Sequence, residues 1–194
     1  YGVHLAGSEY VVVRGFEIRY CGETCVGITD ASRGCVIYEN VLHNAPGALS
    51  IHGERIHDTV VWRNTMYERG LSDFTWNAIK ASNYRRQGIT CFSGRGSSIS
   101  HNRVDGFFDL IDPEVWEHTD RIDLNRDLDV MFNVLLNAGD DAIEADGGGV
   151  NYRIHGNRIR NCFVAISIAP VEKGPLYVTR NDATYKLIMF KMNV

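Results

Sequence analysis

Apolar residues recur at two fixed offsets from an asparagine along most of the chain. Three residues before the asparagine stand Ile37, Val61, Ile99, Val130, Ile154 and Val178, and two residues after it stand Leu42, Met66, Val104, Leu135, Ile159 and Ala183. The runs around them are rich in β-branched residues, whereas the i, i+3, i+4 spacing of an amphipathic helix is almost absent. The pattern predicts short β-strands whose apolar side chains form two inward-facing columns.

The asparagines themselves recur at a nearly constant interval. They are Asn40, Asn64, Asn102, Asn133, Asn157 and Asn181, and they lie 24, 38, 31, 24 and 24 residues apart. A period of 24 residues with two enlarged gaps predicts a solenoid of about seven coils with two loop insertions. Because stacked strands lie about 4.8 Å apart, like side chains pack on like. We expect the asparagines to form one column of turn residues, since asparagine adopts left-handed backbone and bonds neighbouring amides.

A second strand follows each turn, as in the runs 48–51, 141–145 and 164–168. With these runs, the chain resembles the right-handed parallel β-helices of the pectate-lyase-like superfamily over essentially its whole length. The resemblance implies an all-β, single-stranded right-handed parallel β-helix that spans residues 1–194 as one domain. We expect it to be a fragment of a longer chain, because residues 1–5 already read as the interior of a coil and residues 186–194 depart from the repeat.

Composition and charge narrow the range of partners. A chain of 194 residues with 44% hydrophobic content buries a substantial core as one domain. The net charge of −4 argues against nucleic acid and anionic membranes, and no run of 18 apolar residues could span a bilayer. The spacing of the five cysteines does not match a structural zinc site. From the habits of the fold, we expect a secreted, cell-surface or periplasmic protein.

The most acidic stretch, residues 137–149, carries a candidate site. It contains Asp140, Asp141 and Glu144, and the local spacing of 31 residues places Asp140 beside Asp109 of the preceding coil. Two carboxylates about 5 Å apart suit the acid and nucleophile of a glycosidase, so Asp109, Asp140 and Asp141 are candidate catalytic residues. Strand alternation predicts that Glu144 faces away from Asp141. Alternatively, Asp140, Asp141 and Glu144 hold Ca²⁺, or the acids only cap a turn and face water.

The phrase Gly139-Asp140-Asp141-Ala142-Ile143 resembles the Gly-Asp-Asp step of polygalacturonases, with Asp109 near the position of that family's preceding aspartate. The resemblance implies hydrolysis of a glycosidic bond by paired aspartates. The next coil, residues 164–168, lacks the Gly-His-Gly of that family, and no Arg-Ile-Lys follows it. The resemblance to polygalacturonases is therefore partial.

The two insertions, near residues 71–88 and 112–119, supply the remaining candidates. Flat rings for stacking against sugars are offered by Trp76, Tyr84 and Trp116. Positive charges for a uronate carboxylate are offered by Lys80, Arg85 and Arg86. His118 stands among acidic residues and is a candidate acid or base.

Both insertions follow the second position of the asparagine phrase, so we expect them to rise on the same side and to wall one groove beside Asp109. Alternatively, each tryptophan only packs its own loop against the surface. The sequence thus predicts a polysaccharide lyase or glycoside hydrolase that acts on an acidic polysaccharide in a groove between the insertions, with no cofactor required except possible Ca²⁺. The alternatives are a noncatalytic glycan-binding β-helix and a structural or adhesive one.

Overall fold

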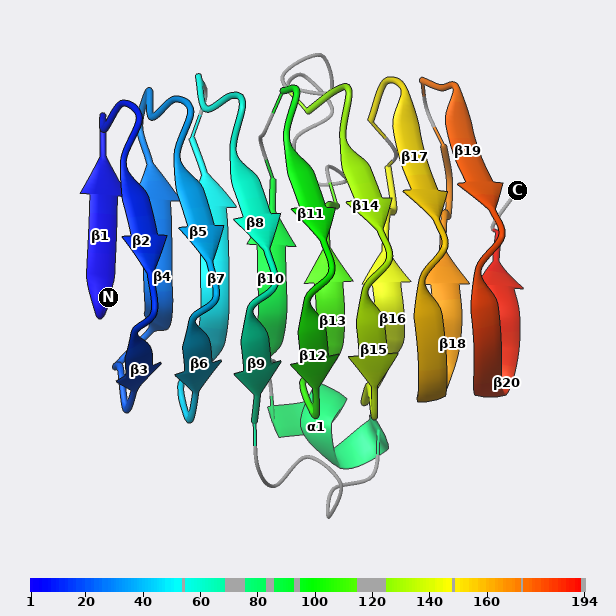
Figure 1. Ribbon diagram of the computed structural model, residues 1–194. Coiled ribbons are helices and arrows are strands. Elements are labelled where there is room, and N and C mark those ends of the chain that lie inside the picture. The colour runs from blue at the N-terminus through cyan, green and yellow to red at the C-terminus, as the bar shows by residue number, and fades with distance from the viewer. Residues whose placement is uncertain are drawn as a thin grey trace.

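A computed structural model of the chain describes residues 1–53, 55–68, 76–82, 86–92, 95–114, 125–147, 149–171 and 173–192. The chain winds into a parallel β-helix of about seven turns with about 24 residues in each (Figure 1). The coils stack side by side, so the two termini lie at opposite ends of one elongated body (Figure 1). The predicted fold class is confirmed.

The strands fall on three faces, and all pairs are parallel. Face 1 consists of β1 (Val3–Ala6), β4 (Thr24–Thr29), β7 (Gly47–His52), β10 (Gln87–Cys91), β13 (Asp109–Asp112) and β16 (Asp141–Glu144). Face 2 consists of β3 (Glu17–Arg19), β6 (Val41–His43), β9 (Thr65–Tyr67), β12 (Arg103–Asp105) and β15 (Val134–Leu136). Face 3 consists of β2 (Val12–Arg14), β5 (Val36–Tyr38), β8 (Val60–Trp62), β11 (Ser98–Ser100), β14 (Asp129–Met131), β17 (Tyr152–His155) and β19 (Leu176–Thr179).

In the last two coils, faces 2 and 1 are joined. The long strands β18 (Arg158–Ser167) and β20 (Asp182–Lys191) each run through both faces and pair with each other. Residues 186–191 therefore continue the solenoid, although their sequence departs from the repeat. As a result, Lys191 pairs with Ser167 at the end of face 1.

The core is built from columns of apolar residues in register. Ile99 pairs with Val61 on one side and with Val130 on the other, and Val104 pairs with Met66 and Leu135 in the same way. All six of these side chains are fully buried. Both apolar columns predicted from the sequence are thus confirmed. A third column on face 1 contains Leu49, Ile89, Ile111, Ile143 and Ile166.

The repeated asparagines form a buried hydrogen-bonded ladder. In each step, the backbone N–H and side-chain amide of one asparagine donate to Oδ1 of the next, as from Asn102 N to Asn133 Oδ1 at 2.9 Å. The predicted column is confirmed, but the expected left-handed asparagine is wrong. The residue before each asparagine takes that conformation, with φ of +57° at His101 and +56° at Phe132. The asparagine side chain instead forms hydrogen bonds with backbone groups that, because of the bend, have no partner on the neighbouring strand.

Removing one step of this ladder is expected to destabilise the protein. Asn133 accepts from Asn102 N–H and donates to Ile99 O at 2.9 Å, and its side chain is fully buried. Asn133→Ala strands these buried groups, so we expect the free energy of unfolding to fall by about 1–3 kcal/mol. The matched control, Asn77→Ala on the exposed surface of α1 (Trp76–Ser82), should change it by less than about 0.5 kcal/mol. Equal effects in urea unfolding would contradict the role of the ladder.

The two insertions leave the solenoid at different corners. The first lies between β9 and β10, at the lower ends of these strands in Figure 1, and includes α1. The second lies between β13 and β14, at the upper ends of these strands. The expectation that both rise on the same side is therefore wrong. They leave from opposite ends of the face 1 strands, so the part of face 1 around β10 and β13 lies between the two points of departure.

Candidate functional site

Four acidic residues mark the ends of two neighbouring strands on face 1. Asp109 and Asp112 begin and end β13, and Asp141 and Glu144 begin and end β16. Carboxylate oxygens of Asp109, Asp141 and Glu144 lie within 4.8 Å of one another, and Asp112, Glu114 and Glu144 form a second such group. We call these five residues the carboxylate cluster.

The Asp112 side of the cluster faces outward from the sheet. Asp112 pairs in register with Thr90 of β10, which pairs with Ser50 of β7. Thr90 and Ser50 line a hollow in the surface of face 1, so the column to which Asp112 belongs points away from the core. The half-buried Glu114 and Glu144 are the members of the cluster that a ligand on face 1 can reach first.

An extra residue in β16 brings the two strands' acids together. The predicted spacing of 31 residues between the two coils holds as far as Asp140. The N–H of Asp140 donates to Phe108 O at 2.8 Å, which places Asp140 beside Asp109. Further along the strand, Ile111 pairs with Ile143, and the spacing is 32 residues. One additional residue therefore enters the strand, as in a β-bulge. The N–H of Asp141 donates to the Asp109 side chain at 3.1 Å.

Two details of the sequence prediction are corrected by this bulge. Asp141, rather than Asp140, is the hydrogen-bonded partner of Asp109. Glu144 does not face away from Asp141, because their oxygens converge. Strict alternation is broken by the additional residue, and Ala142 and Ile143 are both buried.

Burial gives the cluster unusual electrostatics. Asp109, Asp112 and Asp141 are at most 2% exposed. Burial, reinforced by the nearby Glu144, raises the pKa of Asp109 and of Asp112 well above the usual range. Burial and then Asp140 raise the pKa of Asp141 to about 8, and burial also raises the pKa of Glu144. The cluster without a cation therefore retains protons at neutral pH.

Asp112 and Asp141 differ in their hydrogen bonds. Asp112 accepts from the side chain of Gln87 and from the N–H of Glu114. Neither carboxylate oxygen of Asp141 has a hydrogen-bond donor within the described part of the chain. A buried carboxylate without hydrogen-bond donors is costly, so a positive charge beside Asp141 stabilises it.

Two lysines flank the cluster. Nζ of Lys80 in α1 lies 3.2 Å from Asp140 Oδ2 and over the rings of Trp76 and Phe108. Trp76 in turn stacks on Phe163 with ring centroids 6.0 Å apart. These contacts hold α1 against the turn that leads into β16, at the lower edge of the sheet in Figure 1.

The second lysine, Lys191, comes from the last coil. Its Nζ lies 3.6 Å from Asp141 Oδ2 and 3.4 Å from Asp146 Oδ2. Burial by itself lowers the pKa of Lys191, but the fields of Asp141, Asp146 and Glu144 outweigh it, so the pKa is raised. Lys191 therefore holds its proton firmly and supplies a fixed positive charge beside the cluster.

The predicted binding residues have different outcomes. Lys80 is brought to the site, and Trp76, which is 37% exposed, packs beside it. Arg86 forms an ion pair with Glu68 at 2.6 Å. The predictions for Tyr84, Arg85, Trp116 and His118 fall outside the described residues.

Sequence reasoning missed Gln87 and Lys191. The register offered a signal for Lys191, because Glu144 pairs with Ser167 and Ser167 pairs with Lys191 at intervals close to one coil. The departure of residues 186–194 from the repeat obscured that signal.

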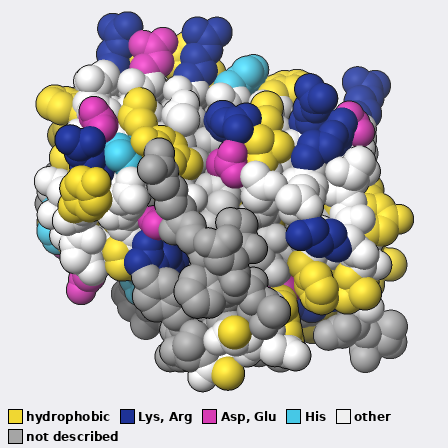
Figure 2. Space-filling view, turned by 90° about the horizontal axis from the view of Figure 1, so that it is seen from below, with side chains coloured by type: hydrophobic (Ala, Val, Ile, Leu, Met, Phe, Trp, Pro, Cys, Tyr) yellow, Lys and Arg dark blue, Asp and Glu magenta, His cyan; other side chains and the backbone are white. Residues whose placement is uncertain are grey.

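Away from the cluster, acidic and basic side chains lie next to one another. Figure 2 shows this mixture on the side of the molecule seen from below. Some of the exposed charges are paired, as in the ion pair of Arg103 with Asp105 at 2.8 Å in β12. Such exposed pairs contribute little stability.

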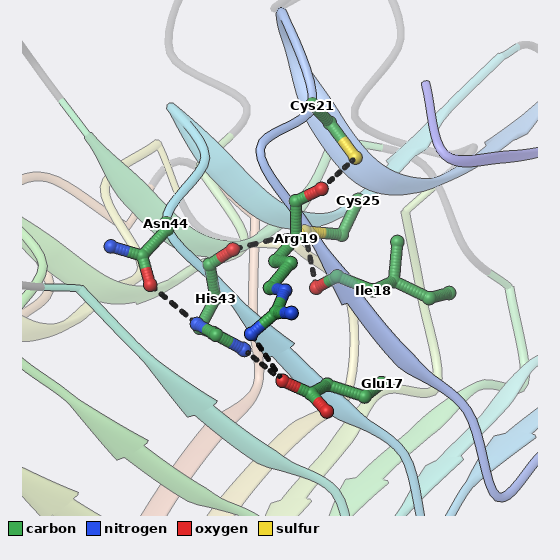
Figure 3. Close-up of polar contacts among 7 residues, drawn as sticks. All are labelled: Glu17, Ile18, Arg19, Cys21, Cys25, His43 and Asn44. Carbon is green, nitrogen blue, oxygen red and sulfur yellow. Dashed lines mark hydrogen bonds and ion pairs between the residues drawn. The ribbon is translucent and has the colours of Figure 1, made fainter.

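A separate group of polar and thiol side chains lies in the first coils (Figure 3). His43 bonds Glu17 through Nε2 at 3.1 Å and Asn44 through Nδ1. The thiol of Cys25 donates to a backbone carbonyl of β3 at 3.3 Å, and burial raises its pKa to about 12. Cys25 and its neighbour Cys21 are free thiols in this structure. A thiol that remains protonated is a poor nucleophile, so the buried Cys25 side chain has a packing role.

Comparison of the sequence with known families agrees with the geometry. Residues 1–184 match the family described as right handed beta helix region. The chain belongs to the right-handed β-helix family. Membership confirms the resemblance at the level of the fold, but members of one fold carry out different reactions. No curated protein matches this right-handed β-helix by sequence similarity. Among its described residues, no helix has the length and apolar character needed to cross a membrane.

Proposed function

We propose that this right-handed β-helix is a calcium-dependent polysaccharide lyase that cleaves a polymer containing uronic acid. The observation that carries the proposal is the convergence of Asp109, Asp141 and Glu144 within 4.8 Å on face 1, with both oxygens of Asp141 lacking hydrogen-bond donors. Lys80 and Lys191 lie at the edges of the same cluster. An acidic polymer of this kind also implies a protein that works outside the cytoplasm.

The donor set fits a hard divalent cation. Ca²⁺ takes oxygen ligands from carboxylates and tolerates irregular geometry, and Asp109, Asp141 and Glu144 would hold it. Without such a cation, the cluster itself offers a uronate polymer no positive charge. A bound Ca²⁺ would neutralise the uronate carboxylate and stabilise the negative charge that develops when the adjacent C5 proton is removed.

The two lysines have different roles in this proposal. Lys191 binds the uronate carboxylate, because its raised pKa keeps it charged. Asp140 is the base, and its carboxylate is held by Lys80, whose Nζ lies over the rings of Trp76 and Phe108. Asp140 takes the C5 proton, the C4–O bond breaks, and a C4–C5 double bond forms. The departing oxygen takes a proton from Lys80, whose side chain is 30% exposed.

A specific observation favours a second candidate, a glycoside hydrolase. Asp141, with its pKa raised to about 8, is protonated at neutral pH, and the neighbouring Asp140 is a carboxylate paired with Lys80. A proton donor beside a carboxylate is the pair that hydrolysis of a glycosidic bond requires. In this candidate, Asp141 protonates the leaving oxygen.

The products of cleavage distinguish the candidates. We expect the protein with Ca²⁺ and a polyuronate to form one unsaturated, ultraviolet-absorbing end for each bond broken, and chelation to stop the reaction. New reducing ends without that absorbance would identify the hydrolase. Binding of the polymer without either product would show a noncatalytic glycan-binding protein, and the absence of binding would leave a structural solenoid.

Calcium should also change the pH dependence of stability. An aspartate whose folded pKa is raised from 3.8 to about 8, as for Asp141, binds its proton more tightly in the folded state. The contribution of Asp141 to stability in a chelator is therefore fully present below about pH 4 and is lost as the pH rises toward about 8. We expect Ca²⁺ to raise the melting temperature most at the upper end of this range. A melting temperature that depends on neither pH nor Ca²⁺ would contradict the proposed site.

A further inference from the structure

Beside the carboxylate cluster, face 1 carries a hollow of about 340 Å³. It spans β4, β7 and β10, the three strands that precede β13 on this face. Side chains from all three strands and from the adjoining turns line it, among them Glu23, Thr24, Ser50, Gln87, Thr90 and Phe92. Its volume falls in the range of small-molecule sites in proteins.

The hollow adjoins the cluster on face 1. Thr90 is the register partner of Asp112, and Gln87 both lines the hollow and donates a hydrogen bond to Asp112. Neighbouring strands lie about 4.8 Å apart, so a polymer that follows the axis of the solenoid passes directly from one to the other.

The chemistry of the hollow differs from that of the cluster. Hydroxyl groups of Thr24, Ser50 and Thr90 and the amide of Gln87 offer hydrogen bonds, while Phe92 offers an apolar ring. Among the described residues that line the hollow there is no lysine or arginine, and the one charged side chain among them is the carboxylate of Glu23. This lining accepts a sugar with hydroxyl groups and disfavours one with a carboxylate.

We infer that the hollow is a subsite for a neutral sugar, so that the substrate is a heteropolysaccharide in which a neutral sugar adjoins the uronate. This inference rests on the proposed function, because the cluster defines where the uronate binds. A polymer composed only of uronates would place a carboxylate beside Glu23 with no described cation in the lining to offset it.

The test compares polymers with and without a neutral sugar. With Ca²⁺ present, we expect kcat/KM for rhamnogalacturonan or hyaluronan, in which uronate and a neutral sugar alternate, to exceed that for polygalacturonate by at least about tenfold. Ser50→Lys places a positive charge in the hollow and should reduce or reverse this preference. Ser50→Gln, a neutral side chain of similar reach, is the matched control and should retain it.

The inference is overturned if polygalacturonate is the better substrate of the parent protein, or if Ser50→Lys and Ser50→Gln have the same preference. If no polymer is cleaved, the proposed function is wrong. The neutral-sugar subsite is then tested by measuring the binding of oligosaccharides. Calorimetric titration in a chelator should then show the parent binding the oligosaccharides of at least one mixed polymer about tenfold more tightly than oligogalacturonate. Equal or reversed affinities would overturn it.

Discussion

Replacing Asp141 by asparagine is expected to reduce kcat/KM for cleavage of the polysaccharide by at least about a thousandfold. Asparagine preserves the shape of the side chain but removes the charge that holds the cation, and it removes the proton donor that the hydrolase candidate requires. Stability in a chelator should stay the same or rise, because a buried carboxylate without hydrogen-bond donors is lost. Kinetic measurements together with thermal melting would separate loss of function from loss of fold.

A matched substitution on another part of the solenoid provides the control. Asp127 lies in the turn before β14 and bonds Arg126 and Asn151, away from the cluster. Its backbone has φ of +57°, which asparagine also adopts. Asp127→Asn should leave both cleavage and the stabilisation by Ca²⁺ unchanged. An Asp141→Asn variant that behaves like Asp127→Asn in both assays would contradict the proposed site.

Replacing Ile154 by alanine is expected to lower the free energy of unfolding by about 2–5 kcal/mol. Ile154 is fully buried and lies in register between Val130 and Val178. Alanine loses the burial of three carbon atoms and leaves a cavity that the stacked coils cannot readily fill.

Arg158 in the same coil is the control for this substitution. Its side chain is exposed on the outward side of β18. Arg158→Ala should therefore change the free energy of unfolding by less than about 0.5 kcal/mol. Equal effects of the two substitutions in urea unfolding would show that the assignment of inward and outward positions is wrong.

The architecture was predictable because the same positions recur in every coil. A solenoid buries its core by stacking like residues, so the spacing of Ile99, Val130 and Ile154 carries the fold directly. The asparagine column followed from the same interval. The backbone conformation of these asparagines could not be predicted, because an asparagine that bonds the backbone and one in the left-handed region look the same in the sequence. The left-handed residues are instead those just before the asparagines, such as His101 and Phe132.

The candidate site was only partly predictable because coil length does not reveal where an additional residue is placed. The spacing of 31 between Asp109 and Asp140 is correct in the turn, but a bulge shifts the register before Ile143 and brings Asp141 and Glu144 to Asp109. The total length of each gap likewise does not show which corner carries the insertion. For this reason the sequence placed both insertions on one side.

The location of the site is tested most directly by a crystal structure of Asp140→Asn soaked with Ca²⁺ and a uronate oligosaccharide. Asp140 is outside the proposed cation ligands, so this variant keeps them while it alters the partner of Lys80. The account predicts a cation held by Asp109, Asp141 and Glu144, a uronate carboxylate beside it, and the oligosaccharide extending along face 1 toward β7. A cation bound elsewhere, or an oligosaccharide on face 2 or face 3, would contradict the account.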